Sequence, residues 1–269
     1  MKKMILGILT ILYFPELSHA TTDGGSCGSN CQWIYDLQTK TLTITGTKQD
    51  SYSPKQDQDG VWHTTAPWVK YERQIERAVV ADTFDTITSH SFYSLHNLKD
   101  VTLPKNLKII RDQTFHNTSL ESVNIPDTVT YIGSAAFQST KLKNVILPDS
   151  VKTIESHAFD SESFQSIVIG NGVTSIGKNA FKSLPDNAKI YCQDTKVHKC
   201  DEIINDSTYG ADKIVKYTKE SAGFISANGK RYSSFEKLVK GIEMKRIYTV
   251  EEAEKVSKKT GNTLKIKYK

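Results

Sequence analysis

The segment VTLPKNLKIIRDQTF (residues 101–115) returns with the same spacing of apolar residues as VNIPDTVTYIGSAAF (123–137) and VILPDSVKTIESHAF (145–159). A shorter version, VIGNGVTSIGKNAF, occupies residues 168–181. Each copy ends in a phenylalanine, and one earlier phenylalanine extends the series with spacings of 23, 22, 22 and 22 residues. A fixed period of this length predicts stacked structural repeats. The phenylalanines that we expect in the repeat core are Phe92, Phe115, Phe137, Phe159 and Phe181.

One repeat makes physical sense as one coil of a solenoid. Val101 and Leu103 are two residues apart, so both point to one face of a short strand. Pro104 ends that strand because it cannot donate a hydrogen bond to a strand ladder. The segment from Leu107 to Phe115 then returns along the opposite wall. A single coil has too few inward residues to bury a core, so we expect coils stacked about 4.8 Å apart along the ladder.

These repeats resemble the BspA-like leucine-rich repeats of bacterial and protist surface proteins. The upstream sequence also resembles the usual leader of that family, with a Cys-Gly pair at 27–28, a Trp, TLTITGT at 41–47 and APW at 66–68. The resemblance covers about residues 27–192. It implies a secreted or surface-displayed right-handed solenoid that binds other proteins, with adhesion to host or neighbouring-cell proteins as the family theme. It implies no catalytic residue.

The N-terminus has the features of a cleaved signal peptide over residues 1–20. Lys2 and Lys3 precede an apolar run from 4 to 14, and Ser18-His19-Ala20 is a small-x-small cleavage site. A membrane anchor is the alternative, but a run of about 11 residues is shorter than the ~20 that span a bilayer. We therefore expect export to the periplasm, the cell surface or the medium, and no transmembrane segment after cleavage.

The rest of the chain divides into three regions. Residues 21–82 predict a β-rich cap with a degenerate first coil, because Trp33, Tyr35 and Leu37 fall at every second position and are followed by a second such run at Leu42 and Ile44. Residues 83–192 are the repeat solenoid. Residues 193–269 predict a small α+β module with a hairpin at 224–232 around an Asn-Gly turn, and two short helices follow it. The predicted fold class is therefore α+β, with a leucine-rich repeat solenoid as its main part.

Four cysteines form two close pairs, Cys27 with Cys31 and Cys192 with Cys200. An even count in an exported chain predicts two local disulfides. One would lie in the N-terminal cap and the other where the chain leaves the solenoid, so both would protect open ends of the stack. A four-thiolate zinc site is the alternative, and it would require the two ends of the solenoid to meet. We expect no metal site.

The strand face is the candidate binding surface. Ile146 and Val168 are expected to be exposed neighbours on adjacent coils, and exposed apolar pairs of this kind mark contact sites. The alternative is that strands favour β-branched residues wherever they point. The loop at 51–66 adds Tyr52 and Trp62, whose side chains suit interface anchors, although Trp62 can instead fold back onto the cap. The outward mid-strand residues in the candidate surface are Thr102, Asn124, Ile146, Val168 and Lys189.

No motif predicts an enzyme. His90, His116 and His157 lie within two residues of repeat phenylalanines, at expected turn positions. The chain contains no G-x-S-x-G, H-E-x-x-H or glycine-rich phosphate loop, so we expect no cofactor. The net charge of +5 falls to +4 when residues 1–20 are removed, because two lysines and one glutamate leave (5 − 2 + 1 = 4).

This charge is modest and spread along the chain, so we expect no nucleic-acid partner. The predicted function is non-catalytic binding of a host-matrix, envelope or cell-surface protein, or of a glycan. The alternatives are a structural envelope component and a solenoid that carries a C-terminal module with its own activity.

Overall fold

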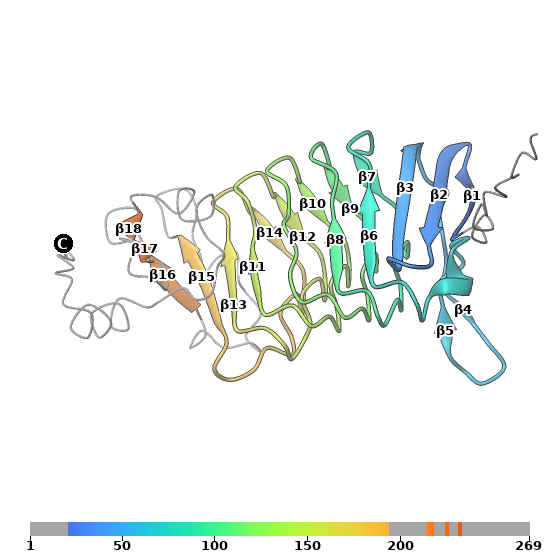
Figure 1. Cartoon of the computed structure of the whole chain (residues 1–269). Coiled ribbons are helices and arrows are strands. Elements are labelled where there is room, and N and C mark those ends of the chain that lie inside the picture. Colours follow the sequence, from blue (N-terminus) through green and yellow to red (C-terminus); the bar gives the residue numbers. More distant parts are fainter. Residues whose placement is uncertain (1–20, 194–213, 218–223, 226–230, 233–269) are drawn as a thin grey trace, which may run out of the picture.

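Short strands from successive coils line up in two walls that run along an elongated stack (Figure 1). The computed structural model describes residues 21–193, 214–217, 224–225 and 231–232. Within each wall, neighbouring strands pair in parallel. The front-wall strands are β6 (Arg77–Val80), β8 (Asp100–Thr102), β11 (Asn144–Ile146), β13 (Ser166–Ile169), β15 (Lys189–Gln193) and β16 (Ile214–Tyr217). The back-wall strands are β7 (Thr86–Ile87), β9 (Ile109–Ile110), β10 (Tyr131–Ile132), β12 (Thr153–Ile154) and β14 (Ser175–Ile176).

An antiparallel cap covers the N-terminal end of the front wall. β1 (Thr22–Gly28) pairs antiparallel with β2 (Asn30–Asp36), which pairs antiparallel with β3 (Thr41–Lys48). β3 then pairs in parallel with β6, so the cap and the first coils share one sheet. Trp33 opposes Ile44 across this hairpin, and both are buried. The alternation of apolar and polar residues along the sequence predicts this pairing, because one face of the cap strands covers the core.

A second, smaller hairpin stands out from the stack beside the cap (Figure 1). It consists of β4 (Lys55–Gln56) and β5 (Trp62–His63), which pair antiparallel. A short 3₁₀ helix, η1 (Val69–Tyr71), follows it. Tyr71 donates a hydrogen bond to Asp23 of β1 at 2.7 Å, and Lys70 forms an ion pair with the same carboxylate. Lys70 is the first cause of the low pKa of Asp23, which is about 2.

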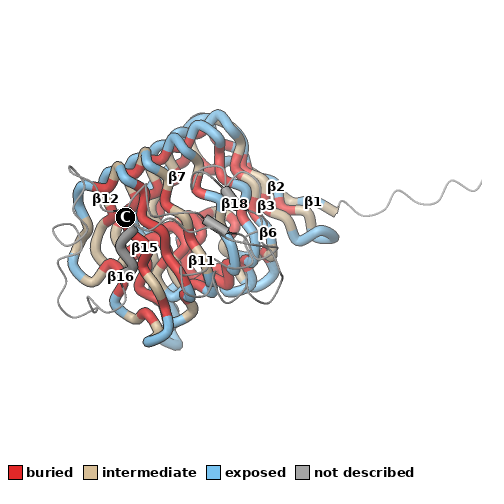
Figure 2. The backbone as a smooth tube through the Cα atoms, turned by 90° about the vertical axis from the view of Figure 1, so that its left-hand side faces the viewer, coloured by how far each residue is buried: buried red, intermediate tan, exposed pale blue. Residues whose placement is uncertain are grey.

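The core is a continuous apolar interior enclosed by the coils (Figure 2). The five repeat phenylalanines are all buried, and each ring stacks on the next. The ring centroids of Phe92 and Phe115 are 5.1 Å apart, and those of Phe137 and Phe159 are 5.3 Å apart. Trp68 extends this stack at the N-terminal end, 6.2 Å from Phe92. Each aromatic ring therefore buries its neighbour, so no coil holds a complete core of its own.

The turn before each repeat phenylalanine has a left-handed backbone. The residue two positions earlier has a φ of 61° at His90, 52° at Ala135 and 58° at His157. In this turn the phenylalanine N–H donates to a carbonyl of the following coil, as from Phe137 to Ala158 at 2.8 Å. Side chains with a Cβ disfavour this conformation, and alanine gains no local hydrogen bond from it. The turn geometry is thus imposed by the stacking of coils.

The front wall has a gap at one coil. Val123 and Ile125 were expected to alternate on a strand, but residues 121–126 form none. Within this described segment, no backbone hydrogen bond joins residues 122–125 to β8 or β11. The contact that remains nearby is long, 3.4 Å from the N–H of Glu121 to the carbonyl of Lys99. Asn124 favours turn conformations over strands. The back wall continues across the same coil without a break.

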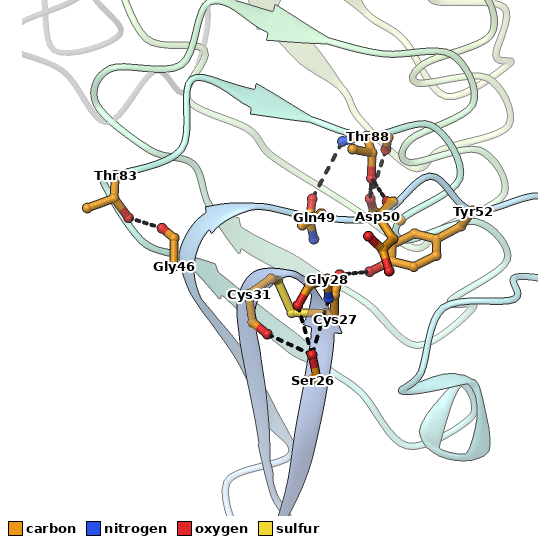
Figure 3. Close-up of a disulfide and its surroundings, with 11 residues drawn as sticks. Ser26, Cys27, Gly28, Cys31, Gly46, Gln49, Asp50, Tyr52, Thr83 and Thr88 are labelled. Carbon is orange, nitrogen blue, oxygen red and sulfur yellow. Dashed lines mark hydrogen bonds between the residues drawn. A yellow bond between two sulfur atoms is a disulfide. The ribbon is translucent and has the colours of Figure 1, made fainter.

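The expected disulfide between Cys27 and Cys31 is formed, and it closes the tip of the β1–β2 hairpin (Figure 3). The carbonyl of Cys27 accepts hydrogen bonds from the N–H of Asp50 and the hydroxyl of Tyr52. The bridge therefore fixes a point on which the following loop packs. Cys192 is buried in β15, and its expected partner Cys200 lies outside the described residues.

The parallel ladder continues past residue 192, where the repeat pattern ends. β16 pairs with β15 and places Val215 beside Tyr191. Farther along, β17 (Phe224–Ile225) pairs antiparallel with β18 (Arg231–Tyr232), as the Asn-Gly turn between them predicts. The expected helices at 233–241 and after Thr249 lie outside the described residues, so the helical part of the predicted α+β module stays a prediction. The described part is strand-rich, with η1 as its helical element.

Replacing Phe137 with alanine should lower the free energy of unfolding by about 3–5 kcal/mol, because it leaves a cavity between two stacked rings. A urea melt of the mature chain measures this change. Trp62 is 48% exposed, so its replacement by alanine serves as a control and should shift stability by less than about 0.5 kcal/mol. Equal effects of the two variants would contradict a core role for Phe137.

Replacing Ala135 or Ala136 with glycine should distinguish the stability cost of the left-handed turn from the stability contributed by packing. Ala136→Gly should lower the free energy of unfolding by about 1–2 kcal/mol, through backbone entropy and a lost methyl group. Ala135→Gly should cost much less, because relief of the left-handed conformation offsets about 1–2 kcal/mol. Thermal and urea melts of both variants measure the difference. Matching losses would show that Ala135 carries no strain.

Candidate binding face

A row of uncharged outward residues crosses the N-terminal half of the front wall. Strand register places Ile34 beside Thr43, Thr43 beside Val79, and Val79 beside Thr102. Ile34 is 49% exposed and Thr102 is exposed, whereas Thr43 and Val79 are half-buried. Because side chains alternate along each strand, this row lies on the face opposite the core. We call it the front row, and it continues by the repeat period to Asn124 and Ile146.

The sequence predicts that Ile146 and Val168 are exposed neighbours on the front wall, and this prediction is wrong for Val168. Ile146 is half-buried and faces outward, but Val168 is only 1% exposed. The ladder places Val168 between Ile146 and Tyr191. All four residues of β13 are buried, so both faces of this strand are covered. The expected exposed pair of Ile146 and Val168 therefore does not exist.

Lys189 belongs to a different row from the one predicted. It pairs with Ser166, whose partner on the other side is Asn144. The hydroxyl of Ser166 donates to the side-chain oxygen of Asn144 at 2.7 Å. Lys189 is half-buried and two residues away from Tyr191, which occupies the front-row position of that strand. Asn124 is exposed as expected, although it lies in the gap rather than in a strand.

Charged side chains border the front row, and their signs alternate from coil to coil. Lys40 contacts Glu76 at 2.5 Å, and Lys99 contacts the same carboxylate at 3.7 Å. Arg77 lies opposite Asp100, 3.8 Å away. The hydrogen bond to Glu76 raises the pKa of Lys40. This border therefore presents paired charges, in which three basic side chains contact two carboxylates.

Tyr52 is not an exposed anchor. It is 7% exposed, and its hydroxyl donates to the carbonyl of Cys27 at 3.0 Å. Its ring meets Trp68 edge to face, with centroids 5.5 Å apart, and burial raises its pKa. A tyrosine beside the disulfide packs on the cap because the bridge leaves a backbone acceptor there. Trp62, in contrast, is exposed on the β4–β5 hairpin with Val61 beside it.

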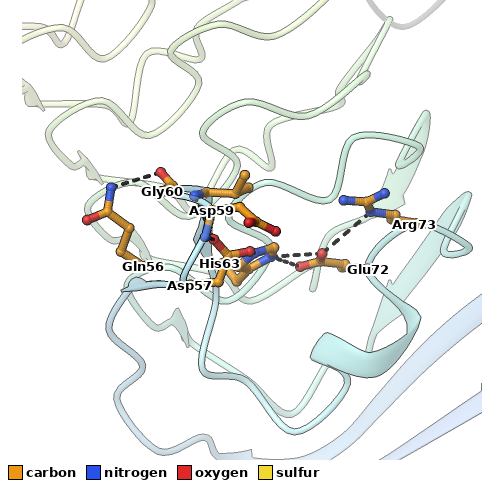
Figure 4. A network of polar contacts seen from close by, with 8 residues as sticks. Gln56, Asp57, Asp59, Gly60, His63, Glu72 and Arg73 are labelled. Atoms are coloured by element: carbon orange, nitrogen blue, oxygen red, sulfur yellow. Dashed lines mark hydrogen bonds and ion pairs between the residues drawn. The ribbon is translucent and has the colours of Figure 1, made fainter.

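The same hairpin holds an ionic cluster that sequence reasoning missed (Figure 4). His63 lies between two carboxylates, with Nε2 2.8 Å from Asp57 and Nδ1 2.8 Å from Glu72. Hydrogen bonds to Asp57 and then to Glu72 raise the pKa of His63. The three residues are spaced irregularly in a polar loop, so the sequence contained no signal beyond their charge. The two carboxylates contact opposite nitrogens of one ring, which does not direct them to a common metal position.

The repeat histidines have structural partners. His90 directs Nδ1 to the carbonyl of Tyr52 at 3.0 Å, and His157 contacts Asp160 at 2.8 Å. Desolvation lowers the pKa of both His90 and His116. Among the described residues, no serine, threonine or cysteine side chain bonds a histidine ring, and no cluster of three or more His, Cys, Asp or Glu side chains suits a metal ion. Nor does any helix of that part of the chain have the length and apolarity to cross a membrane.

Two solved structures align with this chain, and the first of them resembles it in fold. A leucine-rich repeat protein from Eubacterium ventriosum ATCC 27560 aligns at 24% identity with a TM-score of 0.53, over 64% of this chain and 44% of that chain. This chain thus spans less than half the length of that protein. A leucine rich cell surface protein from Faecalibacterium prausnitzii A2-165 aligns at 24% identity with a TM-score of 0.36, over 76% of this chain and 59% of that chain. No curated protein matches the chain.

The repeats themselves match a family model, which is described as a BspA type leucine rich repeat region. The match covers residues 70–187 in six copies. It begins within the first coil, before the regular phenylalanine series, so the degenerate coil is part of the array. Residues 70–187 of this chain therefore match a BspA-type leucine-rich repeat region.

Proposed function

We propose that this protein is an exported, non-catalytic binding module that holds a protein partner on the front row, from Ile34 to Ile146. The observation that carries the proposal is the accessible row of uncharged side chains on a rigid sheet. Parallel strands of a solenoid hold such residues at a regular spacing, and this array lets a partner contact several coils at once. The binding face is the N-terminal half of the front wall, because Val168 is covered.

The charges beside the front row favour a protein partner over a polyanion. Phosphate backbones are bound by clusters of lysine and arginine. Here Arg77 is paired with Asp100, and Lys40 and Lys99 share the carboxylate of Glu76, so the basic side chains are not clustered without acidic partners. Apolar and hydroxyl groups with a polar rim are the usual surface chemistry of protein interfaces. A glycan partner would use only the hydroxyl and amide groups of the front row. Enzyme treatment of the extracts, described below, distinguishes a glycan partner from a protein partner.

Export is supported by the chain's covalent chemistry. Cys27 and Cys31 form a disulfide, which persists in oxidising compartments outside the cytosol. Lys2, Lys3 and the apolar run that follows them are the features of a signal peptide. We propose that the mature protein begins near Thr21 and is secreted or held at the cell surface.

Replacing Ile146 with lysine should weaken capture of the partner by about 10-fold or more, because it places a charge in an interface of uncharged residues. The matched control is Ile109→Lys, which changes a half-buried outward isoleucine on the back wall. The measurement is quantitative pull-down from envelope and host-matrix extracts with the oxidised mature chain, followed by titration of each captured protein. Equal losses with the two variants would rule out the front row.

Treatment of the extracts with a protease or a glycosidase identifies the class of partner. Loss of capture after protease alone supports a protein, whereas loss after glycosidase alone would contradict this part of the proposal. Val168→Lys is unsuitable as a binding variant, since it would bury a charge and lower stability.

A further inference from the structure

The β4–β5 hairpin is too small to be stable by itself. Each of its strands has two residues, and an isolated two-stranded hairpin is marginal in water. It nevertheless presents Val61 and Trp62, which are 40% and 48% exposed. Backbone hydrogen bonds, such as the one from the N–H of Asp57 to the carbonyl of Val61, close its turn. Side-chain contacts add to them, both between its two strands and between the hairpin and the segment after η1. His63 makes both kinds of contact.

His63 bridges the two carboxylates through opposite ring nitrogens. Nε2 contacts Asp57 within the hairpin, and Nδ1 contacts both carboxylate oxygens of Glu72 at 2.8 Å (Figure 4). A carboxylate can only accept a hydrogen bond, so each contact requires a proton on the nitrogen concerned. A neutral imidazole carries one such proton, whereas the imidazolium carries two. Only the protonated ring satisfies both contacts.

The two contacts differ in what their loss would cost. The Glu72 side chain is 13% exposed, and that of Asp57 is 39% exposed. A partly buried carboxylate that loses its donor pays a large desolvation penalty, but an exposed one is hydrated instead. Asp57 also accepts hydrogen bonds from the N–H groups of Asp59 and Val61. A neutral His63 therefore keeps the proton on Nδ1 for Glu72 and gives up Asp57.

We propose that this hairpin is a proton-controlled arm, whose tip at residues 57–61 is tied to Glu72 only while both ring nitrogens of His63 carry a proton. Loss of one proton leaves His63 attached to Glu72 and frees the tip that carries Val61 beside Trp62. The arm acts independently of the front row.

The charges around His63 determine its pKa, and therefore the pH above which the tip loses its contact with the ring. Lys55 lies opposite His63 in the hairpin ladder and opposes protonation of the ring. Arg73 is 4.0 Å from Glu72, and Asp59 lies at the turn. In η1, Lys70 and Tyr71 are directed to Asp23. The hydrogen bonds to Asp57 and Glu72 outweigh the desolvation of the ring and raise the pKa of His63 above the ordinary value of about 6.5. The ordering of the tip is therefore complete below that ordinary value and is lost as pH rises through the raised one.

Two variants should let His63 keep both side-chain contacts whether or not the ring is protonated. In Glu72→Gln the amide can donate to Nδ1, so a neutral ring keeps its proton on Nε2 and still binds Asp57. In Asp57→Asn the amide can donate to Nε2 while Nδ1 donates to Glu72. Both variants should hold the tip at every pH, although by opposite tautomers. His63→Ala should release it at every pH.

The experiment is amide hydrogen exchange at residues 57–61, corrected for intrinsic rates, with imidazole ¹⁵N shifts of His63, from about pH 5 to about pH 9. The expected result for the natural sequence is protection that falls at least severalfold as His63 titrates, with the neutral ring protonated at Nδ1. Glu72→Gln and Asp57→Asn should keep the protection constant. His90, whose pKa burial lowers, is the internal reference. The proposal would be overturned if amide protection at residues 57–61 stayed constant while His63 titrates. It would also be overturned if protection in the two variants still fell with rising pH.

Discussion

Every coil of this protein depends on its neighbours to exclude water from its core. The stack that starts at Trp68 and runs through five phenylalanines is the clearest form of this constraint, because each ring inside the stack lies between the rings of the two adjacent coils. The left-handed turns, the Phe N–H bonds between coils and the antiparallel cap all follow from it. They satisfy the backbone where the stack turns and cover the apolar end where it begins.

Much of this architecture can be predicted from the sequence, because stacking forces each coil to repeat the same pattern. The period, the buried series and the cap hairpin depend on the spacing of apolar residues, which is local and regular. The disulfide between Cys27 and Cys31 depends on proximity along the chain. Features that depend on the register between coils are harder to predict. Lys189 faces outward as expected, but it pairs with Ser166, and Tyr191 takes the place beside Val168. A difference of two residues preserves the alternation and changes the row.

In the candidate site, too, features that follow local spacing are predictable from the sequence, and features that depend on contacts between distant residues are not. Thr102 and Asn124 are exposed as their outward positions predict, whereas Val168 is buried although it occupies an outward position. Tyr52 is fixed by an acceptor 25 residues earlier, at Cys27. The His63 cluster joins residues that no periodic pattern relates. Long-range polar contacts of this kind are set by the tertiary fold, so a single sequence contains no spacing rule that would reveal them.

The gap in the front wall at residues 122–125 divides an otherwise continuous array. In a linear repeat protein, stability is approximately a sum of terms for each coil and for each interface between coils. The interfaces on either side of this coil keep the phenylalanine stack and the back wall, but they lack the front ladder. They are therefore the weakest couplings in the described array. Under mechanical tension along the solenoid, as on an anchored protein that holds a moving partner, the array would yield there first, as two cooperative segments hinged on the back wall.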